Sequence, residues 1–72
     1  MLKKRTYAEV ILPVPLPKLF TYEIPEEYRD EVSVGKRVIV QFGKKRFYTA
    51  IVRSITDQEP EYEIKGIVTV LD

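Results

Sequence analysis

The sequence lacks two residue types on which much of protein chemistry depends. It contains no cysteine, which excludes a disulfide framework and a cysteine-bound zinc site. It contains no histidine either, and histidine is the commonest general base and metal ligand. The carboxylates fall in expected loops and at an expected helix start, where solvated surface is their ordinary role. We therefore expect no catalytic residue, no metal and no cofactor within these 72 residues.

Long hydrophobic runs are also missing. No apolar run approaches the roughly 20 residues that cross a bilayer. The run that follows the basic start is broken by Glu9 and by prolines, which argues against a signal peptide. A chain of this length makes one domain, residues 1–72, with a thin core, because it buries only about 60% of its unfolded surface. We expect a cytoplasmic protein without a membrane partner.

Turn residues and short apolar runs predict a mainly β fold. Segments rich in Val, Ile, Tyr and Phe recur between turn signals at intervals typical of small barrels and sandwiches. The expected strands cover 7–12, 19–24, 37–42, 46–55 and 62–70. The helical candidate, 25–32, begins with a proline and two glutamates but is barely two turns long. The predicted class is a small five-stranded open barrel or sandwich with at most one short helix near 25–32.

Three prolines at alternate positions follow the first expected strand, in the segment Leu12–Pro17. Each proline fixes φ and removes a backbone donor, so this segment is extended but is not a central strand. Polyproline II along an edge of the domain is the expected conformation. Because Leu12, Val14 and Leu16 could all pack inward, a stiff connector is favoured over a ligand for an SH3-type partner.

Charge is segregated along the chain although the formal net charge is only +1. Between residues 32 and 56 there is no acid, and the acids lie on either side. The cations of that stretch are Lys36, Arg37, Lys44, Lys45, Arg46 and Arg53. Such segregation produces a local positive field. The cations either decorate an exposed hairpin or attract phosphates, and composition leaves both roles open.

The hairpin between the third and fourth expected strands has two possible registers. A two-residue turn at Lys44 and Lys45 aligns Phe42 with Phe47, whereas a three-residue turn aligns it with the face of Tyr48. Both patterns are apolar enough to be buried. In either register one of the rings Phe47 and Tyr48 points inward and the other points outward, beside the cationic turn.

Rings and cations together are compatible with nucleic-acid binding. Cations neutralise phosphates and release counterions, while exposed aromatic rings stack on bases irrespective of sequence. Gly43 would let a ligand approach the backbone closely. The available rings are Phe20, Tyr22, Phe47 and Tyr48. Two other functions stay open from the residues alone: an SH3-like protein-interaction module and an RNA-binding small barrel.

Three segments, taken in order, resemble a known family. They are Val10–Tyr22 (VILPVPLPKLFTY), Val34–Lys44 (VGKRVIVQFGK) and Ala50–Val52, followed by a lysine shortly before VTVLD. Over nearly the whole chain they are similar to the N-terminus of the primosomal protein N′ (PriA) helicases. The resemblance implies a 3′ DNA-binding domain that receives the 3′-terminal nucleotide of a nascent strand at a replication fork.

The same resemblance implies a larger parent protein. In the family this module belongs to an ATP-dependent 3′–5′ DNA helicase of replication restart. Its partners would be forked DNA with a free 3′ end, the helicase core of the same polypeptide and primosome proteins. ATP, magnesium and zinc would be held by the parent's other domains.

By position, the resemblance also implies the binding residues. The 3′-end pocket is expected at Phe20, Thr21, Tyr22, Gly43 and Lys65. Supporting phosphate contacts are expected at Lys44, Lys45 and Arg46. Better-known members have aspartate where this chain has Thr21, and threonine is a weaker acceptor that does not repel phosphate. From the residues alone, one of Phe20 and Tyr22 would pack in the core, and Lys65 would be a solvated strand position beside Glu63.

Overall fold

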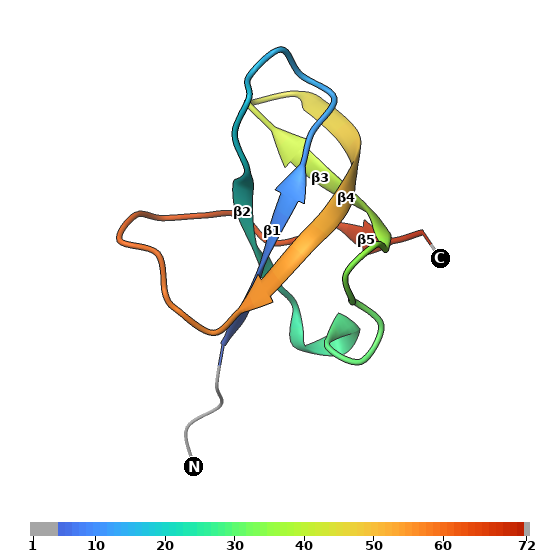
Figure 1. The fold of residues 1–72 in the computed structure, drawn as a ribbon, viewed down its shortest axis with the longest axis vertical. Coiled ribbons are helices and arrows are strands. Elements are labelled where there is room, and N and C mark those ends of the chain that lie inside the picture. Colours follow the sequence, from blue (N-terminus) through green and yellow to red (C-terminus); the bar gives the residue numbers. More distant parts are fainter. Residues whose placement is uncertain (1–4, 72) are drawn as a thin grey trace.

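The computed structural model describes residues 5–71, which form one antiparallel β sheet (Figure 1). The first four residues of the basic start and residue 72 lie outside the described part. The strands follow the order β2-β1-β4-β3-β5 across the sheet. They are β1 (Thr6–Ile11), β2 (Phe20–Ile24), β3 (Arg37–Phe42), β4 (Arg46–Thr56) and β5 (Thr69–Val70). The predicted mainly β class with five strands is confirmed.

Helical structure in residues 5–71 is limited to one 3₁₀ turn, η1 (Glu26–Tyr28). It lies inside the helical candidate 25–32 and follows Pro25, whose fixed φ suits a helix start. Two turns are too few to stabilise an α-helix, because helix nucleation is costly, which explains the shorter element. No helix among the described residues is long and apolar enough to span a membrane.

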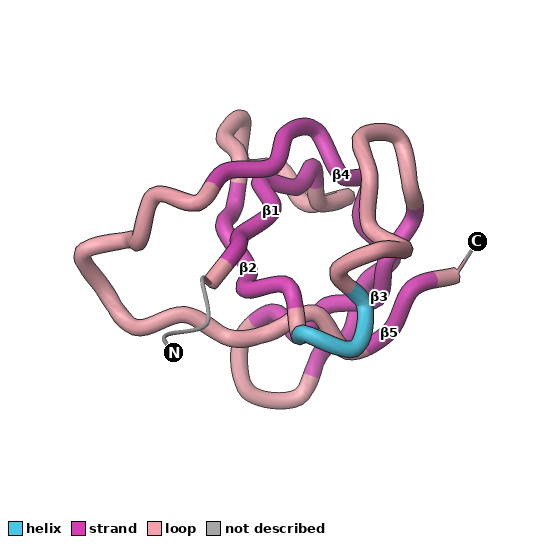
Figure 2. Tube along the Cα trace, turned by 90° about the horizontal axis from the view of Figure 1, so that it is seen from below, coloured by secondary structure: helices cyan, strands magenta, loops and turns pink. Residues whose placement is uncertain are grey.

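The sheet curls into an open barrel (Figure 2). Its two edges meet at one isolated parallel bridge between Glu23 of β2 and Gly66. The Glu23 amide donates to the Lys65 carbonyl at 2.9 Å, and the Ile67 amide donates to the Glu23 carbonyl at 2.9 Å. These bonds hold the chain before β5 against the outer edge of β2.

The fifth strand is much shorter than predicted. The expected strand covered 62–70, whereas β5 covers Thr69–Val70. The segment first bonds to Glu23 of β2 and then changes partner, since the Val68 amide donates to the Ile39 carbonyl of β3 at 2.8 Å. A segment that changes partner midway cannot form one continuous ladder. The prediction of a nine-residue strand was therefore wrong, and residues 62–65 have irregular structure beside β2.

The β3–β4 hairpin adopts the three-residue turn. Phe42 pairs with Arg46, and Gly43 has φ +76°, in the left-handed region that favours glycine. In this register Phe42 and Tyr48 pack against the core, while Phe47 points outward and is 58% exposed. Of the two registers that the sequence left open, the second is correct.

Most core side chains are small or β-branched, and those on the strands lie mainly at alternate positions, as a sheet with one buried face requires. The largest of the fully buried side chains are Val10, Val38, Val40 and Val52. The others in the cluster are Ala8, Leu12, Tyr22, Ile24, Val32, Ala50 and Ile67. This core supports both ends of β2, next to which the cavities described below lie.

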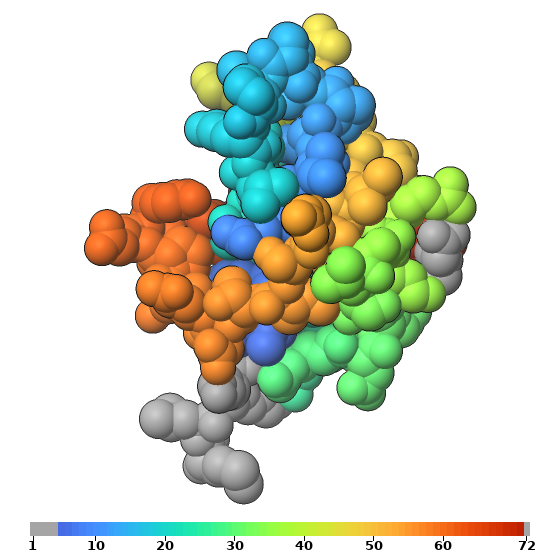
Figure 3. Space-filling view, in the orientation of Figure 1, coloured from blue at the N-terminus to red at the C-terminus, as the bar shows by residue number. Residues whose placement is uncertain are grey.

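Two loops project from the barrel (Figures 1 and 3). In the β1–β2 loop Leu12 is buried and Val14 packs on the core, as predicted, but Leu16 is 46% exposed. Residues 13–15 form successive bends and not a straight extended run, because β1 and β2 are antiparallel and the chain must reverse between them. The second loop, the predicted acidic segment 57–61, stands away from the body of the molecule.

Candidate nucleic-acid interface

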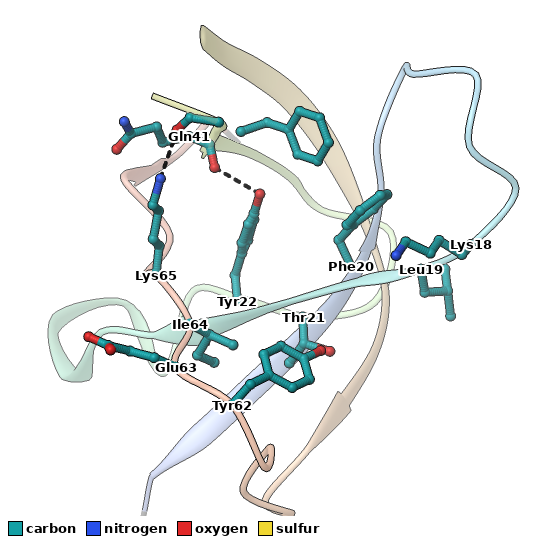
Figure 4. Close-up of a pocket in the computed structure, with 12 residues that line it drawn as sticks. Lys18, Leu19, Phe20, Thr21, Tyr22, Gln41, Tyr62, Glu63, Ile64 and Lys65 are labelled. Carbon is teal, nitrogen blue, oxygen red and sulfur yellow. Dashed lines mark hydrogen bonds between the residues drawn. The ribbon is translucent and has the colours of Figure 1, made fainter. Parts of the chain in front are cut away.

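An open pocket of about 400 Å³ lies where β2 begins and β3 ends (Figure 4). Its lining comes from three separate segments, residues 18–22, 41–43 and 62–65. A volume of this size is within the range of small-molecule sites. The pocket exists because the β2 edge and the chain before β5 are held together by the Glu23–Gly66 bridge.

The structure brings together all five residues of the predicted 3′-end pocket. β2 supplies Phe20, Thr21 and Tyr22, the β3–β4 turn supplies Gly43, and the segment before β5 supplies Lys65. These positions lie far apart along the chain and meet only in the folded barrel. Their binding role stays a prediction.

Tyr22 is mainly a structural residue of this pocket. Its side chain is only 6% exposed and belongs to the core cluster. The hydroxyl donates a hydrogen bond of 2.8 Å to the Gln41 carbonyl, as Figure 4 shows. Burial raises the pKa of the Tyr22 phenol above its ordinary value, because ionisation would place a charge in an apolar environment. Of the two rings, Tyr22 is the one that packs in the core.

Phe20 is only partly buried and forms the aromatic wall of the pocket. Its ring stands edge-on to Phe42, with centroids 5.2 Å apart and planes at 82°. Phe42 in turn meets Tyr48 at 6.1 Å, which anchors the group to the core. The Lys18 ammonium lies 5.1 Å from the Phe20 centroid, in cation–π contact. The ring is thereby fixed in place beside a positive charge.

Lys65 is tied to the turn and is not merely a solvated strand residue. Its ammonium donates to the Gly43 carbonyl at 2.8 Å, and the Gln41 side-chain amide donates to the Lys44 carbonyl at 2.8 Å. An ammonium carries three N–H donors, so two remain for a ligand. A Cβ built on Gly43 would meet nothing within 4 Å, so the space in front of this turn is open.

The electrostatics of the pocket are set by cations. The lining contains Lys18 and Lys65 but only one acid, Glu63. The exposed residues 44–46 add three positive charges on the adjoining turn. The predicted phosphate contacts therefore stand beside the pocket, on the same turn as Gly43.

Sequence reasoning missed three lining residues that matter to the geometry. Lys18 could have been found, because residues two apart in an extended chain share a face and it precedes Phe20 by two. Gln41 and Tyr62 gave no comparable signal. Tyr62 was assigned to a strand but lies in the irregular segment, where it is 66% exposed at the pocket wall.

A curled antiparallel sheet with an aromatic-walled pocket and a basic turn has the features of small β domains that bind nucleic acids. Comparison with known proteins defines the family more closely. The model of the 3′DNA-binding domain (3′BD) of PriA matches residues 9–72. The replication restart protein PriA of Haemophilus influenzae is 36% identical over 64 residues, which are 88% of this chain and 8% of that protein.

The chain therefore belongs to the PriA 3′ DNA-binding domain family, and the resemblance noted in the sequence is confirmed. It is a DNA-binding domain of a replication-restart protein family. The chain spans only 8% of the length of the relative that it matches, so the match does not assign the activities of that whole protein to this chain.

Proposed function

We propose that the pocket beside the start of β2 holds the 3′-terminal nucleotide of a DNA strand at a replication fork. One observation carries this proposal: a single hollow of about 400 Å³ collects the aromatic wall, the glycine turn and the late lysine from three distant segments. The basic turn at residues 44–46 adjoins it and supplies the charge that a phosphate backbone requires.

Each group has a role that follows from its chemistry. The exposed part of Phe20 stacks on or walls the terminal base, since such contacts are independent of sequence. The two remaining donors of Lys65 contact a phosphate or a base acceptor through charge-assisted hydrogen bonds. The Thr21 hydroxyl both donates and accepts, so it is suited to a terminal sugar hydroxyl.

The residues have no part in covalent chemistry in this proposal. They act by binding alone: the pocket accommodates a strand end and excludes a strand that continues. We infer that ATP-dependent 3′–5′ unwinding, with its ATP, magnesium and zinc sites, belongs to other domains of the parent protein. The helicase core of the same polypeptide and primosome proteins are its proposed partners, in the cytoplasm.

Fluorescence anisotropy with labelled oligonucleotides tests the proposal. A strand with a free 3′-hydroxyl should bind more tightly than the same strand with a 3′-phosphate, because the extra group does not fit a pocket made for a hydroxyl end. Equal affinity for both strands would contradict the proposal. Equal affinity for RNA would favour an RNA-binding barrel, and binding that is insensitive to salt would exclude a phosphate-directed site.

A further inference from the structure

A second surface of the sheet has features that the pocket does not use. β4 turns Tyr48, Ala50 and Val52 toward the core, so the alternate residues face outward. Among these outward residues Phe47 is 58% exposed and Ile51 is 47% exposed. On β1, Ile11 pairs directly with Ile51 and is also 47% exposed. We refer to Phe47, Ile51 and Ile11 as the outer β4 face.

Positive charge borders this face at both ends. The basic turn residues 44–46 immediately precede Phe47. Arg53 follows Ile51 at the point where the β1–β4 register shifts, and it is exposed. There is no acid between residues 32 and 56. On β1 the partly buried Glu9 accepts a hydrogen bond of 2.6 Å from Ser54 and lies beyond the paired isoleucines.

A nucleic-acid strand fits this combination better than a protein does. Protein-binding patches on monomers are contiguous apolar areas of several hundred Å². Here Phe47 and Ile51 are separated on the strand by the exposed Thr49, and cations flank the three apolar side chains. An exposed ring beside a track of cations is the arrangement on which unpaired bases stack.

We propose that the outer β4 face is a second DNA contact, on which the bases of an unpaired strand stack at Phe47 while residues 44–46 hold its phosphates. The two surfaces share the β3–β4 turn. Gln41 pairs with Phe47 across the hairpin. Its backbone carbonyl accepts the hydrogen bond of Tyr22 in the pocket, and its side-chain amide donates to the Lys44 carbonyl. Stacking at Phe47 needs no strand end, so this contact goes beyond the 3′-end pocket.

A fluorescent reporter tests this contact directly. The chain has no tryptophan, so Phe47→Trp gives an emission signal from one position. The probe is a small closed circle of thymidine nucleotides, which has no 3′ end to place in the pocket. We expect the circle to quench the emission of Phe47→Trp, and added salt to weaken the quenching.

Ile55→Trp is the matched control. Ile55 lies on the same strand and is 41% exposed, but it borders a cavity lined by two acids, Glu26 and Asp30, and one cation, Arg29. Its emission should be unaffected by the circle. Equal quenching at both positions, or no quenching at Phe47→Trp, would overturn the proposal.

A truncation separates this contact from the pocket. Phe47→Ala should weaken binding of the circle about fivefold or more, which is the lower end of the range for one base–aromatic stack. The preference of a dinucleotide with a 3′-hydroxyl over one with a 3′-phosphate should be unchanged. Wild-type affinity of Phe47→Ala for the circle would overturn the outer-face contact. If the unaltered chain bound the circle but did not distinguish the 3′-hydroxyl dinucleotide from the 3′-phosphate dinucleotide, only the proposed 3′-end pocket would be overturned.

Discussion

β2 begins at Phe20 beside one cavity and ends at Ile24 beside another. The first measures about 400 Å³ and the second about 480 Å³, so size does not distinguish them. The first has an aromatic wall, two lysines and one acid. The second has no ring and is lined by two carboxylates, Glu26 and Asp30, and one cation, Arg29. The charge of the lining therefore favours a phosphate-bearing strand at the first cavity over the second.

This difference shows that the placement of charges along the chain determines the local electrostatic potential more than the net charge does. One group of acids, within residues 23–31, lies at the end of β2 near η1, while the cations of residues 44–46 lie on the hairpin at the other end. A short antiparallel barrel keeps these two groups at opposite ends of the same strand. The net charge is therefore close to zero although the two ends of the molecule differ in electrostatic potential.

The largest expected effect comes from removing the buried ring under the first cavity. Tyr22→Ala should lower the free energy of unfolding by about 3 kcal/mol, because it deletes a buried aromatic side chain and leaves the Gln41 carbonyl without its donor. Urea denaturation measures this loss. Phe47→Ala, which truncates an exposed ring, should change stability by less than about 0.5 kcal/mol. Similar losses in the two variants would contradict the assignment of Tyr22 to the core.

Charge placement should have the next largest effect, and it acts on binding. Reversal of Lys44 and Lys45 to glutamate should weaken DNA binding and reduce the slope of log affinity against log salt by about 2. Asp30→Lys, which adds a cation at the second cavity, should leave that slope unchanged. If Asp30→Lys changed affinity as strongly as the double reversal, net charge and not its placement would govern binding.

Lys65 should have a smaller effect that depends on the strand end. Lys65→Ala removes the charged donor beside Gly43 and should lower affinity for a free 3′-hydroxyl end about tenfold, as expected for one hydrogen bond to a charged group. Anisotropy measures the change, and a circular dichroism melt checks the fold. Lys45→Ala should affect 3′-hydroxyl and 3′-phosphate strands alike. Unchanged end binding in Lys65→Ala would exclude Lys65 from the pocket.

The smallest effect concerns pH. Because burial raises the pKa of Tyr22 above its ordinary value of 10.0, the unfolded phenol ionises first as pH rises. The stability contributed by the protonated form is complete below the unfolded pKa and is lost as pH rises through the folded pKa. Tyr22→Phe should cost about 1 kcal/mol at neutral pH through the lost hydrogen bond. Above the unfolded pKa, the stability of Tyr22→Phe should fall less steeply with pH than that of the unaltered chain. Thermal melting at a series of pH values measures this, and parallel plots of Tm against pH for the two chains would contradict it.

Much of the barrel was predictable because its strands alternate in period two and end at turn residues. Four of the expected strands match the structure to within a residue or so, since local pattern and burial agree there. The fifth was wrong because its limits depend on two partners, Glu23 and β3, that no local pattern reveals. The hairpin register was undecided because it depends on the positive φ of Gly43.

The pocket shows a different limit of sequence reasoning. Its five expected residues came from resemblance to a family, and the structure brings them together. No periodicity connects Lys65 with Gly43, because the bond between them spans 22 positions and forms only when the barrel edges meet. Tyr62 was missed for the same reason.

Amide chemical-shift mapping of the labelled chain with a dinucleotide that carries a free 3′-hydroxyl tests the central claim most directly. The claim predicts that the largest shifts fall on Thr21, Gly43 and Lys65, that Asp30 and Ile55 at the second cavity do not shift, and that a 3′-phosphate reduces the changes. Largest shifts at the second cavity, or identical changes with both dinucleotides, would contradict it.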